Sequence, residues 1–468
     1  MRRIPLHSAG KRAASRHRGR RNKREIQFHM QILSGLAKGT GGGIESQTKE
    51  KAVEIYPRKS ILCFSMKHIF AIAAMAAAVL ESAAFEIYSD FPGGNIDIVE
   101  KGDSGAKIRQ QYRDSDWWFY WSFGVKGAEG RTLTFGFVDS GDVIGSRGPA
   151  ASFDGGKTWK WLGAQGVKRK KHSSSFEFAF PDGAKDVRFA FCLPYMPTDF
   201  DAFAKSAPSL KKMPLCKTRK GRENFAYSLG NPDGKIKIFL TSRHHACETT
   251  GTFAMQGILE EFLKKGGAAE KLLKDAEIVA VPFMDLDGVL DGDQGKGRKP
   301  HDHNRDYTKS PIYPSVAAFQ KLYNAKMEKA EIAIALDLHA PFMFKGGEDN
   351  TNNRTYFVEG PIGNKVENLR KLSKILEAET LKSGEGAIIH LQKWDVKYGT
   401  LWNTPSNMKD VTCSAWAGRH PKAAFACTVE IPYTDCVGAE VNSESLRGFG
   451  ANIAKSLAEY FAAPESKK

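Results

Sequence analysis

Thr-Ser-Arg-His-His-Ala-Cys-Glu, residues 241–248, marks the point where a buried strand gives way to a helix. The apolar run 236–240 before it has the length and residue types of a strand, and apolar residues at helical spacing follow over 255–262. His245 and Glu248 stand three residues apart at this turn, so an imidazole and a carboxylate can face one ion. Zinc accepts this mixture of ligands, and a catalytic zinc needs one further protein ligand, which leaves a position for water. Because a lone His-x-x-Glu is common, the prediction of a metal site depends on motifs further along the chain.

Strands and helices alternate through the second half of the chain. Continuous apolar runs of the kind found in strands buried on both faces cover residues 236–240, 278–283 and 332–338. Helical patterns cover residues 249–264, 315–329, 364–381 and 443–462. This alternation predicts an α/β domain over residues 223–465, with a mixed, largely parallel sheet flanked by helices. In such a domain the functional site is expected at the carboxyl ends of the strands.

Polar side chains stand at those strand ends. The third strand ends in His339, which is the natural third metal ligand. Asp302 can accept the remaining ring proton of a ligating histidine and so fix its tautomer. Asn304 and Arg305 suit a carboxylate, because the guanidinium forks onto both oxygens and the amide donates a further bond. Glu430 lies on an otherwise apolar strand, where a charge is costly unless it is paired or functional.

The chain before this domain has a different pattern. From residue 85 to 203 short alternating runs are separated by turn signals, which predicts an antiparallel β-sandwich. The basic stretch 204–222 is the predicted linker. The aromatic run 117–121 raises the possibility of a sugar-binding surface, but alternate members of the run are more simply explained as sandwich core. No catalytic cluster is recognised in this part of the sequence.

The first 84 residues are interpreted as two segments. Residues 1–65 hold 15 Lys and Arg against four Glu, so most of the net charge of +16 belongs to them, and they are predicted to be a non-native or disordered extension. Residues 66–84 combine a basic start, a twelve-residue apolar core and small residues at Ser82 and Ala84, which is typical of a signal peptide cleaved after Ala84. Met66 is therefore the expected start of a secreted or periplasmic protein. The alternatives are a basic nucleic-acid-binding tail and an Arg-rich transit peptide.

The rest of the composition limits the partners. Residues 69–80 are too few to form a permanent membrane anchor. The small positive charge that remains after residue 84 gives no reason to expect nucleic acid or another acidic polymer as partner. Six cysteines follow residue 84, an even number that permits disulfides in an exported chain, although the sequence does not define their pairing. They are Cys192, Cys216, Cys247, Cys413, Cys427 and Cys436.

Taken in order, the motifs resemble those of zinc metallocarboxypeptidases of the carboxypeptidase A type, and most closely the cytosolic carboxypeptidase branch. The matching catalytic motifs are His245-x-x-Glu248, Asp302-x-Asn304-Arg305, His339 and Glu430. In that branch a β-sandwich precedes the peptidase domain, and the features that match it are Gly94-Asn95, Trp118-Phe119, and Phe189-Ala190-Phe191-Cys192 running into Pro194-Tyr195. Each motif is weak alone, but four in the same order are a strong match.

The resemblance implies hydrolysis of the peptide bond next to a free C-terminal carboxylate, with one zinc per chain. It assigns the role of zinc ligand to His245, Glu248 and His339. Asn304 and Arg305 would hold the terminal carboxylate, Asp302 would support a ligating histidine, and Glu430 would be the general base. Zinc would activate a water and polarise the carbonyl, and the glutamate would take the proton and later return it. A nearby cation would stabilise the oxyanion.

Two positions depart from the family pattern. Gly295 stands where the cytosolic branch carries its oxyanion-stabilising arginine. Lys296 or Arg298 would then supply the cation, and Arg298 is favoured because its forked donors suit an oxyanion. His303 replaces the usual apolar residue of its motif. Tyr398 is the one candidate for the tyrosine that many family members bring over the substrate.

Other interpretations of the same residues stay open. His244 is expected to point away from the adjacent ligand and to have a structural role. One alternative function is a zinc hydrolase that removes an acyl group from an amino acid, and another is a binding protein without turnover. The ordered motifs and the β-sandwich favour the peptidase over the first, and retention of Glu430 with all three ligands argues against the second. The sequence defines neither the preferred C-terminal residue nor the oligomeric state.

Overall fold

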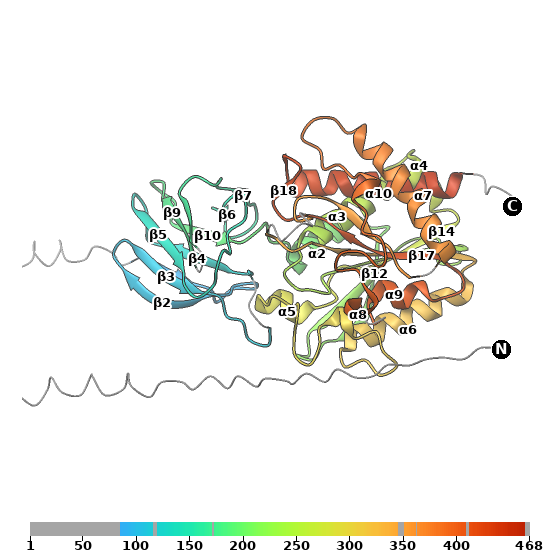
Figure 1. Ribbon diagram of the computed structural model, residues 1–468, viewed down its shortest axis with the longest axis horizontal. Helices are drawn as coiled ribbons and strands as arrows, with labels where there is room; N and C mark the ends of the chain where they lie inside the picture. Colours follow the sequence, from blue (N-terminus) through green and yellow to red (C-terminus); the bar gives the residue numbers. More distant parts are fainter. Residues whose placement is uncertain are drawn as a thin grey trace, which may run out of the picture. The chain divides into compact units, whose positions relative to one another are not determined.

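The computed structural model describes residues 85–115, 119–170, 173–344, 351–361, 363–408 and 411–463 (Figure 1). The predicted extension 1–65, the predicted signal peptide 66–84 and Trp118 lie outside these ranges. Within them, no helix combines the length and the apolar character that crossing a bilayer requires. The predicted domain boundaries stay predictions.

Two five-stranded sheets, ordered β1-β4-β10-β6-β7 and β2-β3-β5-β9-β8, form the N-terminal part. Their strands are β1 (Glu86–Tyr88), β2 (Asp97–Gly102), β3 (Gly105–Arg109), β4 (Ser122–Lys126), β5 (Thr132–Phe137), β6 (Ala150–Ser152), β7 (Lys160–Trp161), β8 (Val167–Lys170), β9 (Ser173–Ala179) and β10 (Asp186–Ala190). The predicted antiparallel pairing is confirmed except for β3 and β5, which run parallel. The sandwich itself stays a prediction.

Aromatic side chains from both sheets share one core. Phe123 of β4 lies 5.1 Å from Phe135 of β5 and 5.4 Å from Phe189 of β10, measured between ring centroids. Trp121 is fully buried beside them, and its Nε1 donates to the carbonyl of Val143. Buried aromatic rings contribute a large apolar area, which explains why this run packs inward. The core interpretation is confirmed for the described part of the aromatic run, 119–121, and the sugar-binding interpretation is wrong there.

A seven-stranded sheet, ordered β11-β12-β14-β13-β15-β17-β16, forms the second part. Its strands are β11 (Lys211–Lys217), β12 (Glu223–Gly230), β13 (Ile236–Ser242), β14 (Ala276–Val281), β15 (Ile332–His339), β16 (Tyr356–Val358) and β17 (Ala423–Glu430). The central strands β14, β13, β15 and β17 are parallel, and the outer pairs are antiparallel. The predicted mixed, largely parallel sheet is therefore confirmed.

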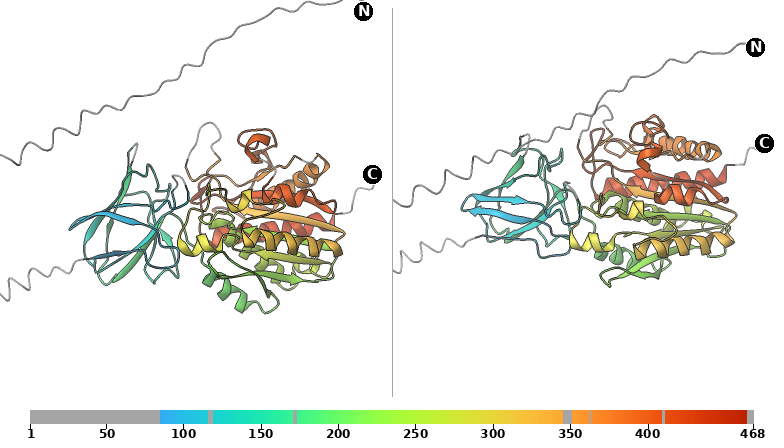
Figure 2. Two further views of the ribbon diagram at one scale, coloured as in Figure 1. Left: turned by 90° about the horizontal axis from the view of Figure 1, so that it is seen from below. Right: turned by 60° about the horizontal axis from the view of Figure 1, so that its bottom comes forward.

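Helices cover both faces of this sheet (Figures 1 and 2). α3 (Thr250–Leu263), α7 (Gly363–Leu381) and α10 (Ser443–Ala462) contribute to one apolar core, and α6 (Pro314–Lys329) and α9 (Cys413–Gly418) to another. The shorter elements are α2 (Pro197–Ser206), α4 (Ala268–Leu272), α5 (Leu286–Asp291), η1 (His303–Arg305), η2 (Gln392–Trp394), α8 (Pro405–Met408), β18 (Asp435–Cys436) and β19 (Ala439–Glu440).

The predicted linker 204–222 differs from expectation, because much of it forms the edge strand β11. Exposed lysines such as Lys211 and Lys212 are typical of an edge that must not pair with another chain. The local sequence does not reveal that β12 will supply a partner for these residues.

Strand order places the functional ends side by side. β15 lies between β13 and β17, and all three run in the same direction. In this register His339, the last residue of β15, pairs directly with Glu430, the last residue of β17. The turn after β13 carries residues 243–249 to the start of α3. The sheet therefore brings together three motifs that are almost 200 residues apart in the sequence.

Candidate metal centre

The three predicted metal ligands meet at the carboxyl ends of the central strands. Nδ1 of His245 lies 2.7 Å from Oε1 of Glu248, and Nδ1 of His339 lies 2.6 Å from the other oxygen, Oε2. All three side chains are buried, and their ligand atoms lie within 4.8 Å of one another. Two imidazoles that turn the same ring nitrogen toward one carboxylate form a donor set that suits zinc.

The outer ring nitrogen of each histidine faces a second carboxylate. Nε2 of His245 lies 3.6 Å from Oδ1 of Asp302, and Nε2 of His339 lies 2.8 Å from Oδ2 of Asp337. A carboxylate in this place holds the ring proton on Nε2 and leaves the Nδ1 lone pair for a metal. At His245 the gap is too long for a hydrogen bond, so its Nε2 and Oδ1 of Asp302 face each other without another partner. These features fit a zinc ion held by His245, Glu248 and His339.

Burial and neighbouring charges displace the pKa values of the carboxyl groups. Burial alone would raise the pKa of Glu248, but the charges of His245 and His339 outweigh it and hold that pKa well below its usual range. Burial would also raise the pKa of Asp302, but the charge of His245 outweighs it and lowers that pKa. Burial raises the pKa of Glu430 to about 7, and its Oε2 is buried without a hydrogen-bond partner. Glu430 is thus poised for proton transfer near neutral pH.

A cavity of about 560 Å³ opens over these groups. Its polar wall contains His245, Lys296, Asn304, Arg305, His339 and Glu430, and its apolar wall contains Pro341, Phe342, Phe344 and Trp402. The structure thus brings both predicted carboxylate-binding residues to the predicted metal ligands. Asn304 is fixed in place because its Oδ1 accepts from the backbone amide of Cys413.

Arg298 is not brought into this cavity. Its guanidinium is almost completely buried elsewhere and pairs with three carboxylates, those of Asp114, Asp285 and Asp293. These charges hold the guanidinium in an ion-pair network between the loop and the N-terminal part of the chain. The preference for Arg298 as the cation beside the reacting carbonyl therefore does not agree with its position.

Lys296 is the residue of this loop that lines the cavity, with its Nζ 3.8 Å from Oε1 of Glu248. Gly295, where the resemblance expects an arginine, has a φ of 79°, and a Cβ there would lie 2.2 Å from the amide nitrogen of Ala246. A side chain at that position would therefore be strained and would clash with backbone. The loop instead carries its cation, Lys296, one residue after Gly295.

The N-terminal sheets help to hold this loop. Oε1 of Gln294 accepts from the Tyr120 amide, and its Nε2 donates to Sγ of Cys247, beside the metal ligands. The side-chain amide of Asn95 donates to the carbonyl of Gly292 at 2.6 Å. These contacts give a structural reason for Asn95, which the sequence analysis identified only through the family resemblance.

Three other residues have positions that the sequence did not reveal. His303 stacks on Tyr313, with ring centroids 3.7 Å apart, and does not line the cavity. Tyr398 is not among the residues that line the cavity either. Asp337 was not singled out, although a signal existed. It stands two residues before His339 on β15, and residues i and i+2 of a strand share a face.

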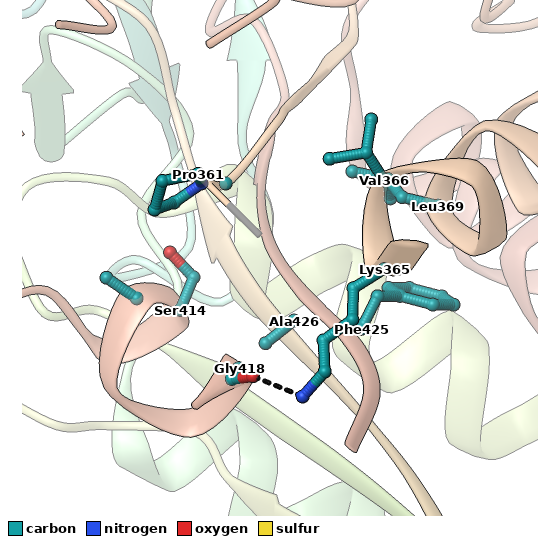
Figure 3. A pocket seen from close by; sticks show the side chains of 10 residues that line it. Pro361, Lys365, Val366, Leu369, Ser414, Gly418, Phe425 and Ala426 are labelled. Carbon is teal, nitrogen blue, oxygen red and sulfur yellow. Dashed lines mark hydrogen bonds between the residues drawn. The ribbon is translucent and has the colours of Figure 1, made fainter. Parts of the chain in front are cut away.

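A second crevice lies between α7, α9 and β17 (Figure 3). Its free volume is about 20 Å³, which holds a water molecule but no peptide side chain. Lys365 closes one side by donating from Nζ to the carbonyl of Gly418 at 2.6 Å. This crevice offers no alternative site for a substrate.

Comparison with known proteins adds a family match. A family model described as zinc carboxypeptidase, Peptidase_M14, matches residues 198–438. Cytosolic carboxypeptidase 3 of Mus musculus is 31% identical over 193 residues, which are 38% of this chain and 19% of that protein. Cytosolic carboxypeptidase 6 of Caenorhabditis elegans is 27% identical over 286 residues, which are 54% of this chain and 61% of that protein. This chain therefore covers less than two thirds of either relative.

Solved structures share the fold. A metallo-carboxypeptidase from Burkholderia cenocepacia matches 81% of this chain and 99% of its own, with a TM-score of 0.67 and 17% identity. A metallo-carboxypeptidase from Pseudomonas aeruginosa, solved in complex with (2-guanidinoethylmercapto)succinic acid, matches 80% of this chain and 98% of its own, with a TM-score of 0.66 and 18% identity. These matches extend beyond the region of the family model, so the shared fold includes part of the N-terminal sheets.

The relatives overturn the prediction of secretion. They are named cytosolic carboxypeptidases, which contradicts a secreted or periplasmic location and a signal peptide at 66–84. The six described cysteines are all free, so the permitted disulfides are not formed. The prediction failed because a basic start followed by an alanine-rich apolar run satisfies a compositional rule that does not by itself specify export.

Proposed function

The chain belongs to the zinc carboxypeptidase family, and on that basis we propose that it removes the C-terminal residue of peptides by metal-assisted hydrolysis with Glu430 as general base. One observation carries the proposal. The inward nitrogens of His245 and His339 converge with Glu248 on the floor of an open cavity, beside a buried glutamate whose pKa lies near neutrality. An inactive binding protein would have no need of that glutamate.

Four residues of the cavity have roles in this reaction. Arg305 and Asn304 hold the terminal carboxylate of the peptide through charge-assisted hydrogen bonds. Zinc, when bound, lowers the pKa of a water and polarises the scissile carbonyl. Glu430 takes a proton from the attacking water and gives it to the leaving amine. Lys296 places a positive charge beside the oxygen on which negative charge develops.

Substituting Lys296 by methionine is expected to lower kcat by about 10²-fold, because the oxyanion loses its cationic partner. The folded state should be almost unaffected, since the side chain is about a third exposed. Steady-state kinetics on a C-terminal dipeptide substrate and urea unfolding measure the two effects.

The matched control is Arg298→Met on the same loop. It leaves three carboxylates without their cation and is expected to cost about 3 kcal/mol of stability, with a smaller change in kcat for the folded fraction. Full activity in Lys296→Met would remove the lysine from the mechanism.

The proposed function is tested with the full chain on a mixed peptide library and on the same peptides blocked by a C-terminal amide. Release is expected from free peptides and not from amides, because Asn304 and Arg305 require a carboxylate. The library includes acidic as well as neutral and basic terminal residues. Hydrolysis of N-acyl amino acids without release from any peptide would favour the acyl-amino-acid hydrolase, and peptide binding without turnover would favour the binding protein.

A further inference from the structure

His244, the residue before the predicted metal ligand His245, has a hydrogen-bond partner at each of its two ring nitrogens. It precedes His245 in the turn after β13, is fully buried, and does not line the cavity. Its Nδ1 lies 2.7 Å from Oδ1 of Asp337, and its Nε2 lies 2.7 Å from the hydroxyl of Tyr307. Both ring nitrogens are therefore engaged at short distances.

Asp337 connects this histidine to the candidate metal centre. Its Oδ1 also accepts from the hydroxyl of Thr241 at 2.8 Å, and its Oδ2 lies 2.8 Å from Nε2 of His339. The rings of His244 and His339 are parallel within 6°, with centroids 5.8 Å apart on either side of the carboxylate. A buried chain thus runs from Tyr307 through His244 and Asp337 to a predicted zinc ligand.

The hydrogen bonds of this chain determine where the protons lie. If the phenol of Tyr307 donates to Nε2 of His244, the proton of that ring sits on Nδ1 and is donated to Asp337. Asp337 then accepts from Nε2 of His339 as well, so the Nδ1 lone pair of His339 faces Glu248 and the metal position. The carboxylate is held by three donors, which fixes its orientation in a fully buried place.

A second metal site is the competing explanation, because ligand atoms of His244, Asp337 and His339 also lie within 4.8 Å of one another. The neighbours argue against it. The hydroxyl of Thr241 already donates to Asp337, and the hydroxyl of Tyr307 lies within hydrogen-bond distance of His244. Neither His244 nor Asp337 lines the cavity. A metal there would have to displace a hydrogen bond from each of them.

We infer that His244 and Tyr307 are positioning residues, which act through Asp337 to hold His339 in the tautomer and orientation that bind the metal. This inference rests on the proposed function in one respect, namely that zinc binds to His245, Glu248 and His339. It assigns a role to His244 that its sequence context did not suggest.

The experiment compares three variants. His244→Phe removes both ring hydrogen bonds. His244→Asn keeps a donor toward Asp337 but does not reach Tyr307, and Tyr307→Phe removes only the hydroxyl. The matched control is His390→Asn, because His390 is equally buried, contacts the hydroxyls of Thr355 and Ser373, and does not line the cavity.

Two properties are measured on the full chain: the zinc dissociation constant, by competition with a chromophoric chelator, and the visible spectrum of the Co²⁺-substituted protein. We expect His244→Phe to weaken zinc binding by about 10- to 100-fold, with smaller losses in the two milder variants. The Co²⁺ spectrum should change in all three. The control should lose stability but keep wild-type zinc affinity and spectrum.

Zinc affinities for Tyr307→Phe and His244→Asn that equal those of the wild type and the control would overturn the inference. Because these variants are conservative, this result stays available even if His244→Phe does not fold. Two zinc ions per wild-type chain, with one lost in His244→Asn, would overturn it in favour of the second metal site. A wild-type chain that binds no zinc would refute the proposed function itself, and the inference with it.

Discussion

Replacement of Glu430 by glutamine is expected to lower kcat by about 10³-fold while the protein keeps its fold and its metal. Glutamine has almost the same shape but cannot take a proton from water. The substitution also leaves the strand register intact, so His339 keeps its neighbour across β15 and β17. Turnover of a peptide substrate gives kcat, and elemental analysis gives the zinc content of the same sample.

The matched control for this substitution is Glu277→Gln. Glu277 is another fully buried glutamate on a strand of the same sheet, but it pairs with Lys237 and Lys326 and does not line the cavity. Its replacement should lower stability and leave kcat unchanged. If Glu430→Gln keeps more than a tenth of the wild-type kcat, the residue is not the general base.

The pH profile measures the same group independently. A general base acts only when it is ionised, so kcat/KM should fall about tenfold for each pH unit below its pKa. Burial raises the pKa of Glu430 to about 7, and a bound cation nearby would lower it. The acid limb of the profile is therefore expected at or below about pH 7, and a rate that increases with acidity would contradict the assignment.

The central sheet was predictable for a simple physical reason. A strand buried on both faces must be a continuous apolar run, and such runs are conspicuous in sequence. A charged residue at the end of such a run, such as His339 or Glu430, then stands out against it. Edge elements lack this contrast, which is why β11 was predicted as linker: its pairing depends on β12 and not on its own pattern.

The choice between Lys296 and Arg298 was not accessible from the sequence. The chemistry of guanidinium favoured Arg298, but its guanidinium pairs with Asp285 and Asp293 and with Asp114, which lies 184 residues earlier and belongs to the N-terminal part. His244 illustrates the same limit. It does not line the cavity, as expected, but β13 ends at Ser242, so strand alternation is not the reason, and its partner Tyr307 lies 63 residues further along the chain. A local sequence pattern therefore does not reveal the function of a side chain whose partners lie far away in the chain.

The charge balance around the centre leads to the last prediction. Four carboxyl groups, those of Glu248, Asp302, Asp337 and Glu430, are buried within a small region. Histidines are partners of the first three, and a histidine that binds a metal through one ring nitrogen is neutral, so it compensates a carboxylate only through hydrogen bonds. Burying ionised carboxylates without a full cationic partner is costly. A divalent cation at this point is therefore expected to stabilise the folded protein as well as to supply the proposed chemistry.

Removing zinc with a chelator is expected to abolish turnover and to lower the unfolding temperature, and adding zinc should restore both. A ligand that binds only the folded state adds about 4 kcal/mol when its concentration is 1,000 times its Kd, so the unfolding temperature should rise with zinc concentration. Thermal unfolding of the full chain across a zinc titration measures this. Glu248→Ala should abolish the dependence, whereas Glu359→Ala, which removes a buried carboxylate paired with Arg370 outside the cavity, should preserve it. An unfolding temperature independent of zinc would show that Glu248 and the two histidines do not hold a metal in the folded protein.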